Sequence, residues 1–220
     1  MRSQGVIIPF DHPTDWVNSM VAVAKNTEKL RICNDPRLLN KSIKREHHLP
    51  TIEEITTRLN GAKYFSTLDA RSGFWEISLD EESSLLTTFS IIFDRYRFTR
   101  MPFAIHNAQE VFHKRLQEVL EDLPGVETDI DNILVWGQTQ DEHDERLIML
   151  LQRARDCNLK LNPEKSRIRK TEVLYIGHML TGNGVKPDAS KLEAITKMPA
   201  PEDKLGMQRL LGMVNYVAKF

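Results

Sequence analysis

Three polar side chains that can bind a cation precede an apolar run near the middle of the chain. Asp129, Asp131 and Asn132 come directly before the apolar residues 133–136. Apolar residues on both sides of a polar pair, at strand-like length, predict a β-hairpin with Asp131 and Asn132 at its turn. Turn chemistry alone could place these residues there, because Asp and Asn tolerate the left-handed backbone of tight hairpins. A catalytic or metal site would need a second carboxylate from elsewhere in the chain.

That second carboxylate lies near the end of segment 63–70, "KYFSTLDA". The segment alternates as a strand does, so Phe65, Thr67 and Asp69 share one face. If this strand and the hairpin are neighbours in a sheet, Asp69 and Asp131 meet. Two carboxylates that close repel each other unless a cation lies between them. Mg²⁺ is typically held by one or two carboxylates and substrate phosphates, and a pair of such ions can catalyse phosphoryl transfer.

Helices and strands alternate around these residues. Thr51 and Glu54 form the pattern of a capping box, and Asn60-Gly61 ends the short helix that it begins. Apolar residues at helical spacing predict further helices at about 107–121, 141–158, 188–198 and 205–220, and segment 172–180 is typical of a strand. This order predicts an α+β fold in which helices cover one face of an antiparallel sheet and the other face can hold a ligand.

The composition is that of an ordinary globular protein. The 220 residues include 40% hydrophobic and 28% charged residues, with a formal net charge of -1, which predicts a packed core. The two cysteines have no partners at metal-binding spacing, so neither a zinc site nor a disulfide framework is indicated. No apolar run is long enough for a membrane span, and we predict an intracellular protein of the cytoplasm, nucleus or a virus-like particle. Basic clusters at 41–48, 95–100 and 165–170 allow a local positive groove.

Six stretches occur in a recognisable order along the chain: "RICNDPRLLNKSIKREHHLPTIEEI", "YFSTLDARSGFWEISLDEESSLLTTF", "RYRFTRMPFAIHNAQEVFHKRLQEVL", "DIDNILVWG", "LKLNPEKS" and "VLYIGHMLTGNGVKPDASKLEAI". In this order they resemble the reverse transcriptase domain of gypsy-type LTR retrotransposons, over residues 13–220. The resemblance implies a right-hand polymerase fold, with fingers at 1–62, truncated at the N-terminus, and a palm at 63–198 that an intervening fingers segment near 80–100 interrupts. Residues 199–220 would form a linker and the start of the following thumb or connection region.

The resemblance implies catalytic roles for four residues. Asp69 matches the first catalytic aspartate and Asp131 the first of two hairpin aspartates, and both would hold Mg²⁺, or Mn²⁺ in its place. Asn132 stands where the family has the second hairpin aspartate. Lys165 matches a lysine proposed to protonate the pyrophosphate leaving group. The stretch "LYIGHML" looks like the hairpin that grips the primer end.

The resemblance also implies a binding site for the incoming deoxynucleoside triphosphate, made of Lys25, Arg31, Ala70, Phe74, Phe103 and Ala104. Lys25 and Arg31 would contact the phosphates, which suit an ammonium and a forked guanidinium. Phe74 would lie beneath the sugar, where its bulk excludes a 2′-hydroxyl and selects deoxynucleotides. Phe103 and Ala104 would pack beside the nucleotide and the template.

Several positions depart from the family pattern. Asn132 offers an oxygen ligand without negative charge, and losing one such electrostatic contribution costs on the order of 3 kcal/mol, or roughly a hundredfold in rate. Ala104 replaces a family glycine, where an added methyl would obstruct a close backbone approach or a positive φ angle. Asp129 puts a charge at a strand position that is normally apolar, and burying it unpaired would be costly.

Two hypotheses follow from the resemblance and its departures. The first is an RNA-directed DNA polymerase that adds deoxynucleotides to a primer 3′ end on an RNA or DNA template by a two-metal mechanism, with catalysis impaired by Asn132. The alternative is a non-catalytic remnant of a retrotransposon that at most binds nucleic acid through its basic clusters. An unrelated binding domain, with Asp131 and Asn132 serving only as a turn, is disfavoured by the number of ordered motifs.

Overall fold

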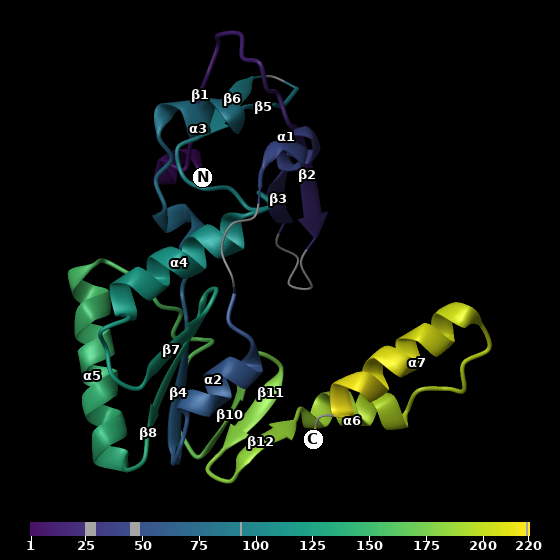
Figure 1. Cartoon of the computed structure of the whole chain (residues 1–220). Helices are drawn as coiled ribbons and strands as arrows, with labels where there is room; N and C mark the ends of the chain where they lie inside the picture. The colour runs from purple at the N-terminus through teal and green to yellow at the C-terminus, as the bar shows by residue number, and fades with distance from the viewer. Residues whose placement is uncertain (25–29, 45–48, 93, 219) are drawn as a thin grey trace. The chain divides into compact units, whose positions relative to one another are not determined.

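The computed structural model describes residues 1–24, 30–44, 49–92, 94–218 and 220, with the backbone alone at 22–24 and 30–33. The chain divides into two compact units, each assembled from several segments. The first unit comprises Met1–Leu49, Ala70–Leu120 and Ala154–Leu161; the second comprises Pro50–Asp69, Glu121–Arg153 and Asn162–Phe220. Figure 1 labels the helices and strands.

A four-stranded antiparallel sheet is the centre of the second unit. Its order is β7-β8-β4-β9, with β7 at Val126–Asp129, β8 at Asn132–Gly137, β4 at Tyr64–Asp69 and β9 at Arg167–Lys170. The register pairs Asp69 with Asn132 across β4 and β8. The predicted neighbourhood of the Asp69 strand and the hairpin is therefore confirmed.

The hairpin turn lies one residue earlier than the sequence pattern predicts. Asp129 pairs with Asn132, so Ile130 and Asp131 form the turn and Asn132 is the first residue of β8. The prediction that Asp131 and Asn132 share the turn is wrong, because Ile130 takes the left-handed conformation with a φ of 53°. A β-branched residue is a rare choice for that conformation, so turn propensity favoured the following polar pair instead.

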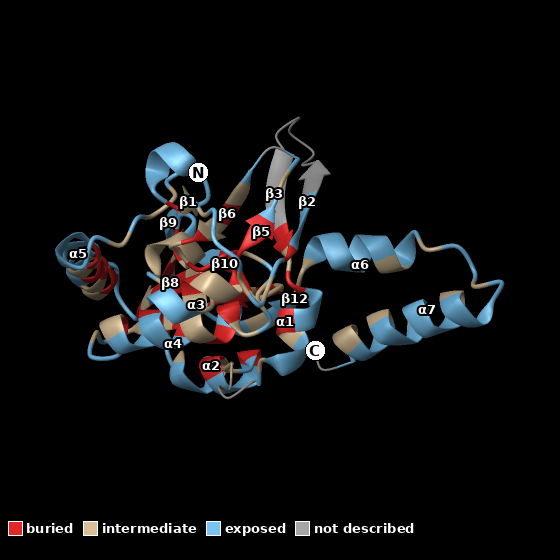
Figure 2. Cartoon of the chain, turned by 90° about the horizontal axis from the view of Figure 1, so that it is seen from above, coloured by how far each residue is buried: buried red, intermediate tan, exposed pale blue. Residues whose placement is uncertain are grey.

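Both faces of this sheet are packed. Helix α5 (Gln140–Asp156) follows β8 and places the buried His143 against Ser66 of β4 on one face. On the opposite face, Phe65 and Leu134 form a buried cluster with helix α2 (Ile52–Arg58) and with Tyr175. In Figure 2 buried residues lie on β8 and on one side of α5. Helices thus pack on both faces, whereas the sequence pattern predicts them on one face only, and the end of the sheet that carries Asp69 borders the candidate site.

Helix α2 begins where the sequence predicts. The Thr51 side chain accepts from the Glu54 amide at 3.3 Å, and the Glu54 side chain accepts from the Thr51 amide at 2.9 Å. The capping box is confirmed, because its two hydrogen bonds are local and depend on residue type alone.

Segment 172–180, which the sequence pattern presents as one strand, is a hairpin. Strands β10 (Glu172–Tyr175) and β11 (His178–Thr181) pair antiparallel, and β12 (Gly184–Pro187) completes a second sheet. The single-strand interpretation is wrong because Ile176 and Gly177 both adopt positive φ angles, 47° and 69°, and reverse the chain between Tyr175 and His178.

Two helices end the second unit. They are α6 (Ala189–Thr196), with Asp188 as N-cap, and α7 (Lys204–Val217), with Asp203 as N-cap. They pack on each other, and neither carries a buried residue (Figure 2).

The first unit holds two small sheets and short helices. Its elements are η1 (Arg2–Gln4), β1 (Ile7–Pro9), β2 (Ser19–Ala24), β3 (Leu30–Asp35), α1 (Arg37–Ser42), η2 (Gly73–Glu76), α3 (Glu81–Leu86), β5 (Phe89–Ser90), β6 (Arg95–Phe98) and α4 (Ala108–Leu120). Its sheets have the orders β1-β6-β5 and β2-β3. Helix α4 confirms the helix expected at 107–121. Within the described residues, no helix combines the length and the apolar character needed to cross a bilayer.

Candidate active site

A row of polar side chains crosses the sheet of the second unit. Asn132 pairs with Asp69 on one side and with Asp129 on the other. Residues directly opposite each other in antiparallel strands point to the same face, so these three side chains lie together. Asp131 follows in the adjoining turn. The sheet thus gathers the three polar residues that the hairpin sequence displays and adds Asp69.

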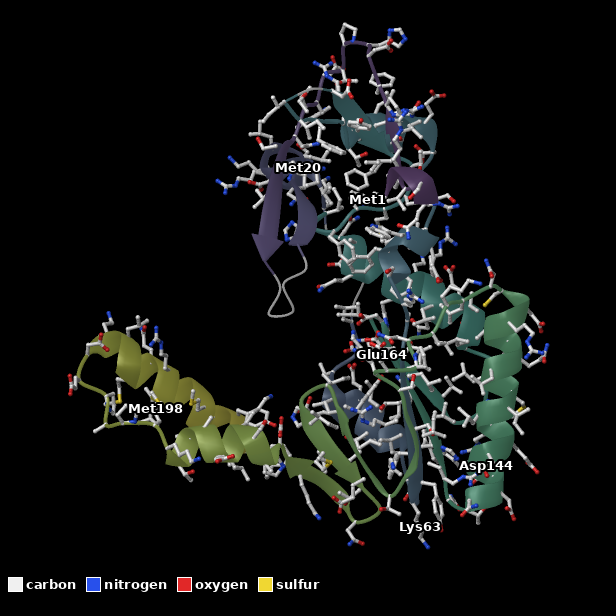
Figure 3. All side chains as sticks on the ribbon, turned by 180° about the vertical axis from the view of Figure 1, so that it is seen from behind. Met1, Met20, Lys63, Asp144, Glu164 and Met198 are labelled. Carbon is white, nitrogen blue, oxygen red and sulfur yellow. The ribbon has the colours of Figure 1, made fainter. Side chains whose placement is uncertain are left out.

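Lys165 completes this cluster. Its Nζ lies 2.7 Å from Oδ2 of Asp69, whose side chain is 12% exposed, whereas the Lys165 side chain is 61% exposed. A backbone hydrogen bond holds the loop that carries Lys165 beside Asp69, since the Asn162 amide donates to the Asp69 carbonyl at 2.8 Å. Figure 3 labels the neighbouring Glu164 at this end of β4 and Lys63 at the other. The predicted catalytic residues Asp69, Asp131, Asn132 and Lys165 are therefore brought together.

Negative charge accumulates at this end of the sheet. The pKa of Asp131 is raised, chiefly by burial and further by the Asp69 carboxylate, while its own backbone amide and Lys165 act in the opposite direction. Burial also raises the pKa of Asp129, with a further contribution from Asp131. Desolvated carboxylates that lie close together bind protons or cations more readily than isolated ones.

Two carboxylates of this cluster have the chemistry to hold a divalent cation. The described residues contain no group of three or more His, Cys, Asp or Glu side chains placed to hold a metal. Asp69 and Asp131 supply two carboxylates, which is the protein share of a typical Mg²⁺ site that takes further oxygens from phosphates and water. The Asn132 amide donates to Asp131 Oδ1 at 3.3 Å, which orients that carboxylate.

The cluster opens into a groove of about 670 Å³ within the second unit. The groove lining includes Asp69, Asn132, Lys165, Arg167, Lys170, Tyr175, Ile176, Gly177 and Met179. The lining joins the carboxylates of Asp69 and Glu172 to the cations of Lys165, Arg167 and Lys170, a mixture that suits a phosphate-bearing chain with a metal at the reacting position. The sequence shows a basic run at 165–170, but it does not single out Arg167 and Lys170 as groove residues.

The first unit holds four of the predicted nucleotide-binding residues: Ala70, Phe74, Phe103 and Ala104. The Phe74 and Phe103 ring centroids lie 5.3 Å apart. Phe74 also meets Phe112 of α4 at 5.7 Å, and a Cβ on the adjacent Gly73 would come within 2.3 Å of the Phe112 ring. Glycine is thus required beside Phe74, because any side chain there would displace the aromatic cluster.

The two remaining predicted nucleotide ligands cannot be placed in the same way. Lys25 lies outside the described residues, and Arg31 is described through its backbone in β3.

Ala104 adopts the positive φ angle that its glycine-like position predicts. Its φ is 75°, and its carbonyl accepts from the Asn40 side chain at 2.8 Å. The side-chain Oδ1 of Asn40 in turn accepts from the His106 amide at 2.8 Å. Asn40 therefore clamps this loop, a role with no recognisable sequence signal because the partners are 64 residues apart.

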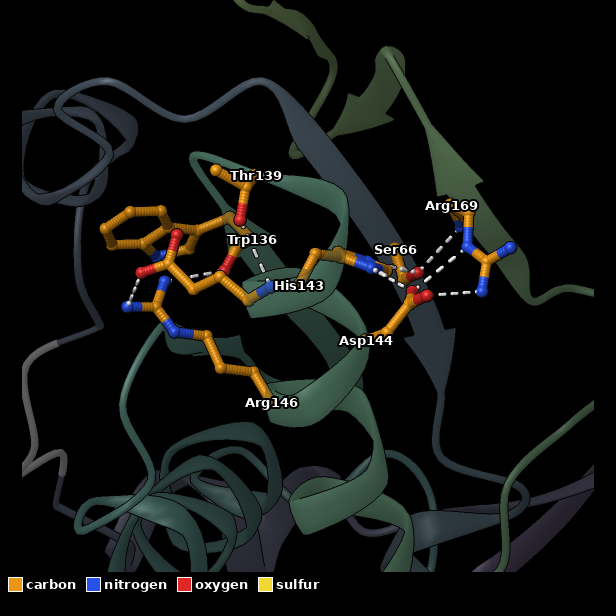
Figure 4. Close-up of polar contacts among 8 residues, drawn as sticks. Ser66, Trp136, Thr139, His143, Asp144, Arg146 and Arg169 are labelled. Atoms are coloured by element: carbon orange, nitrogen blue, oxygen red, sulfur yellow. Dashed lines mark hydrogen bonds and ion pairs between the residues drawn. The ribbon is translucent and has the colours of Figure 1, made fainter.

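A buried polar cluster beside the sheet has the residue types of a hydrolase triad. Ser66 Oγ lies 2.9 Å from His143 Nε2, and His143 Nδ1 lies 3.0 Å from Asp144 Oδ1 (Figure 4). Both Ser66 and His143 are fully buried. The Ser66 oxygen also accepts from the Arg169 amide at 2.9 Å. The cluster therefore anchors β9 to the sheet and offers no access to a substrate.

Comparison with known proteins identifies the family. The family model described as "Reverse transcriptase (RNA-dependent DNA polymerase)" matches residues 23–180. The Pol polyprotein from transposon gypsy of Drosophila melanogaster is 31% identical over 215 residues, covering 96% of this chain and 21% of the relative. The Pol polyprotein from transposon opus of the same organism is 32% identical over 226 residues, covering 100% and 22%. The chain thus spans about a fifth of these relatives.

Solved structures support the fold. The foamy viral protease-reverse transcriptase in complex with double-stranded DNA matches with a TM-score of 0.87 at 24% identity, covering 98% of this chain and 45% of that one. The same type of protein in complex with an RNA/DNA hybrid gives a TM-score of 0.85 at 24% identity, over 98% and 29%. The predicted α+β fold of polymerase fingers and palm is confirmed. Because the family model matches residues 23–180, the chain belongs to the reverse transcriptase (RNA-dependent DNA polymerase) family.

Proposed function

We propose that this chain adds deoxynucleotides to the 3′ end of a primer paired with an RNA or DNA template, at a rate reduced by Asn132. The observation that carries the proposal is the convergence of Asp69, Asp131 and Lys165, together with the groove that Asp69 and Lys165 line and that has further cations along its wall. That arrangement fits a nucleic-acid strand whose reacting end meets a metal.

The protein's own groups have separate parts in this reaction. Asp69 and Asp131 would hold Mg²⁺, or Mn²⁺ in its place. The metal, when bound, stabilises the attacking and leaving oxygens of phosphoryl transfer. Lys165 would leave Asp69 and present a proton from Nζ to the departing pyrophosphate. Asn132 keeps an oxygen at its position but supplies no negative charge.

The predicted nucleotide-binding residues belong to the same proposal. Phe74 and Phe103 would border the deoxyribose and base, and Ala104 would shape the adjoining loop. Lys25 and Arg31 would meet the triphosphate. The fingers at 1–62, the palm at 63–198 and the following region at 199–220 are the corresponding domain assignment that we propose.

Primer extension on an RNA template, with deoxynucleotides and Mg²⁺ or Mn²⁺, tests the proposal. We expect extension by the parent to disappear in Asp69→Ala and to rise by up to roughly a hundredfold in Asn132→Asp, because a full negative charge then returns to the metal site. The exposed Asp141→Ala provides the matched control, since it removes a carboxylate away from the groove.

A second function, a non-catalytic remnant that binds nucleic acid, is favoured by the amide at Asn132 and by the desolvated charge at Asp129. It predicts that the parent and Asn132→Asp both bind a primer-template and that neither extends it. That result would replace the polymerase proposal.

A further inference from the structure

The turn between β10 and β11 is strained and forms part of the groove wall. Ile176 and Gly177 both have positive φ angles, and Ile176 carries a branched Cβ that disfavours this conformation. Both residues line the groove that contains Asp69 and Lys165. Such a conformation persists only where neighbouring groups hold it.

Tyr216 of α7 makes one of the hydrogen bonds that hold this turn, beside that between the His178 ring Nδ1 and the Ile176 carbonyl oxygen at 2.7 Å. Its hydroxyl donates to the Gly177 carbonyl at 2.5 Å and accepts from the Asp188 amide at 3.3 Å. Asp188 is the N-cap of α6, so one hydroxyl joins the turn to the start of α6. Figure 1 shows α6 and α7 following β12, which continues this small sheet.

Further groups fix the Tyr216 ring. The Lys191 Nζ lies 4.2 Å from the ring centroid and 3.4 Å from the Gly177 carbonyl oxygen. The centroid of the His178 ring lies 5.4 Å from the Tyr216 ring centroid and 5.5 Å from that of Phe220. A Cβ added to Gly177 would meet only the end of the flexible Lys191 side chain, so it is the φ of 69° that favours glycine here. These contacts leave the ring little freedom to carry its hydroxyl away from the turn.

We propose that Tyr216 is a positioning residue, which fixes the Ile176–Gly177 turn so that the primer strand meets a rigid groove wall. This inference rests on the polymerase function proposed above. The Tyr216 hydroxyl bonds the Gly177 carbonyl and the Asp188 amide, so it acts on the groove through the turn. Its loss should weaken the seating of the primer more than the chemical step.

The test compares Tyr216→Phe, which removes only the hydroxyl, with Tyr96→Phe in the first unit, where a hydroxyl that contacts Asp94 is removed. Hydrogen exchange of the peptide spanning residues 173–181 reports on the turn without requiring activity. We expect exchange there to become about fivefold faster in Tyr216→Phe, which corresponds to losing one ordinary hydrogen bond. Tyr96→Phe should leave it unchanged.

Primer seating is measured as the KM for primer-template in extension and as duplex affinity by fluorescence anisotropy. We expect KM and the dissociation constant to rise about fivefold in Tyr216→Phe, with kcat within about twofold of the parent. Unchanged exchange at 173–181, or faster exchange with unaltered duplex affinity, would overturn the inference. If the parent binds duplex without extending it, the polymerase proposal fails, while the exchange and affinity results still decide the role of Tyr216.

Discussion

One methyl group at residue 104 shows how a single substitution is accommodated. Ala104 has a φ of 75°, a conformation that is unfavourable for an L-residue with a Cβ. The Asn40 side chain holds the loop in place through the Ala104 carbonyl and the His106 amide. The backbone of Ala104 therefore keeps its positive φ angle, and the two hydrogen bonds of the Asn40 side chain offset the strain.

Replacing Ala104 by glycine should stabilise the protein by about 1 kcal/mol, because glycine occupies the left-handed region without a Cβ clash. Urea unfolding at neutral pH measures this gain. Ala194→Gly, in the exposed part of α6, is the opposite control and should lose about 1 kcal/mol through helix propensity. A destabilised Ala104→Gly would show that the loop conformation is not the source of strain.

A buried residue of β3 departs from what a strand interior normally contains. Asn34 is 2% exposed, and neither its amide oxygen nor its amide nitrogen has a hydrogen-bond partner in the described structure. Unsatisfied buried amides destabilise a fold. Together with the charge at Asp129, this residue fits a sequence whose individual positions depart from the requirements of its fold.

At the scale of elements, edge strand β9 depends on a side-chain anchor. Its pairing with β4 shifts in register between Phe65 and Thr67, and Arg169 has a φ of 51° there. The Ser66 hydroxyl accepts from the Arg169 amide and contacts Nε2 of His143, and Nδ1 of His143 donates to the Asp144 carboxylate, which can only accept. Asp144 also pairs with the Arg169 guanidinium.

We predict that Ser66→Ala costs about 1–3 kcal/mol, because it leaves a buried imidazole nitrogen and a backbone amide without their partner. Chemical unfolding provides the measurement, with the exposed Ser42→Ala as a control expected to change stability by less than about 0.5 kcal/mol. A loss as small as the control would mean that β9 is held by its backbone pairing alone.

Helix α4 buries a titratable group among its apolar residues. His113 is 3% exposed, and burial lowers the pKa of its imidazole. The neutral form is therefore favoured in the folded state, while the unfolded chain takes up a proton near its ordinary pKa. Stability from this group is full above a pH of about 6.5 and is lost as the pH falls through and below that value.

Thermal unfolding between about pH 7.5 and pH 5, a range that brackets the ordinary pKa of histidine, measures how stability depends on pH. His113→Gln should lose less stability than the parent as the pH falls, because it removes the group that must stay neutral. His106→Gln, at an exposed position near the start of α4, should follow the parent. Equal pH dependence in all three proteins would contradict the burial argument.

At the scale of the whole molecule, the distribution of charge matters more than its sum. The formal net charge is -1, yet Lys165, Arg167 and Lys170 line one groove. Binding to a polyanion depends on the cations that meet phosphates and on the counterions they release. The near-neutral total therefore does not exclude nucleic acid.

Duplex binding should weaken steeply with salt, and Arg167→Ala and Lys170→Ala should each reduce the slope of log affinity against log salt by about one. Fluorescence anisotropy across a salt series gives both slopes. Lys204→Ala, at the first residue of α7 and outside the groove lining, serves as the control and should keep the slope of the parent. Slopes that stay equal in the groove variants would remove these residues from the binding surface.

The features that could be predicted from the sequence are those that depend on neighbouring residues. The capping box of α2, the extent of α4 and the shared face of Phe65, Thr67 and Asp69 follow from local hydrogen bonds and from periodicity. The family resemblance, carried by ordered motifs, was confirmed by the family match over 23–180.

Contacts between groups far apart in the chain could not be predicted from the sequence and are seen in the tertiary structure alone. Lys165 and Asp69 are 96 residues apart, His143 and Ser66 are 77 apart, and Tyr216 and Gly177 are 39 apart. The hairpin register also belongs to this level, since pairing with β4 and the left-handed Ile130 moved the turn by one residue. Local propensity describes a residue's own backbone preferences, whereas contacts across the sheet and with α7 depend on the packing of the whole unit, which no short stretch of sequence specifies.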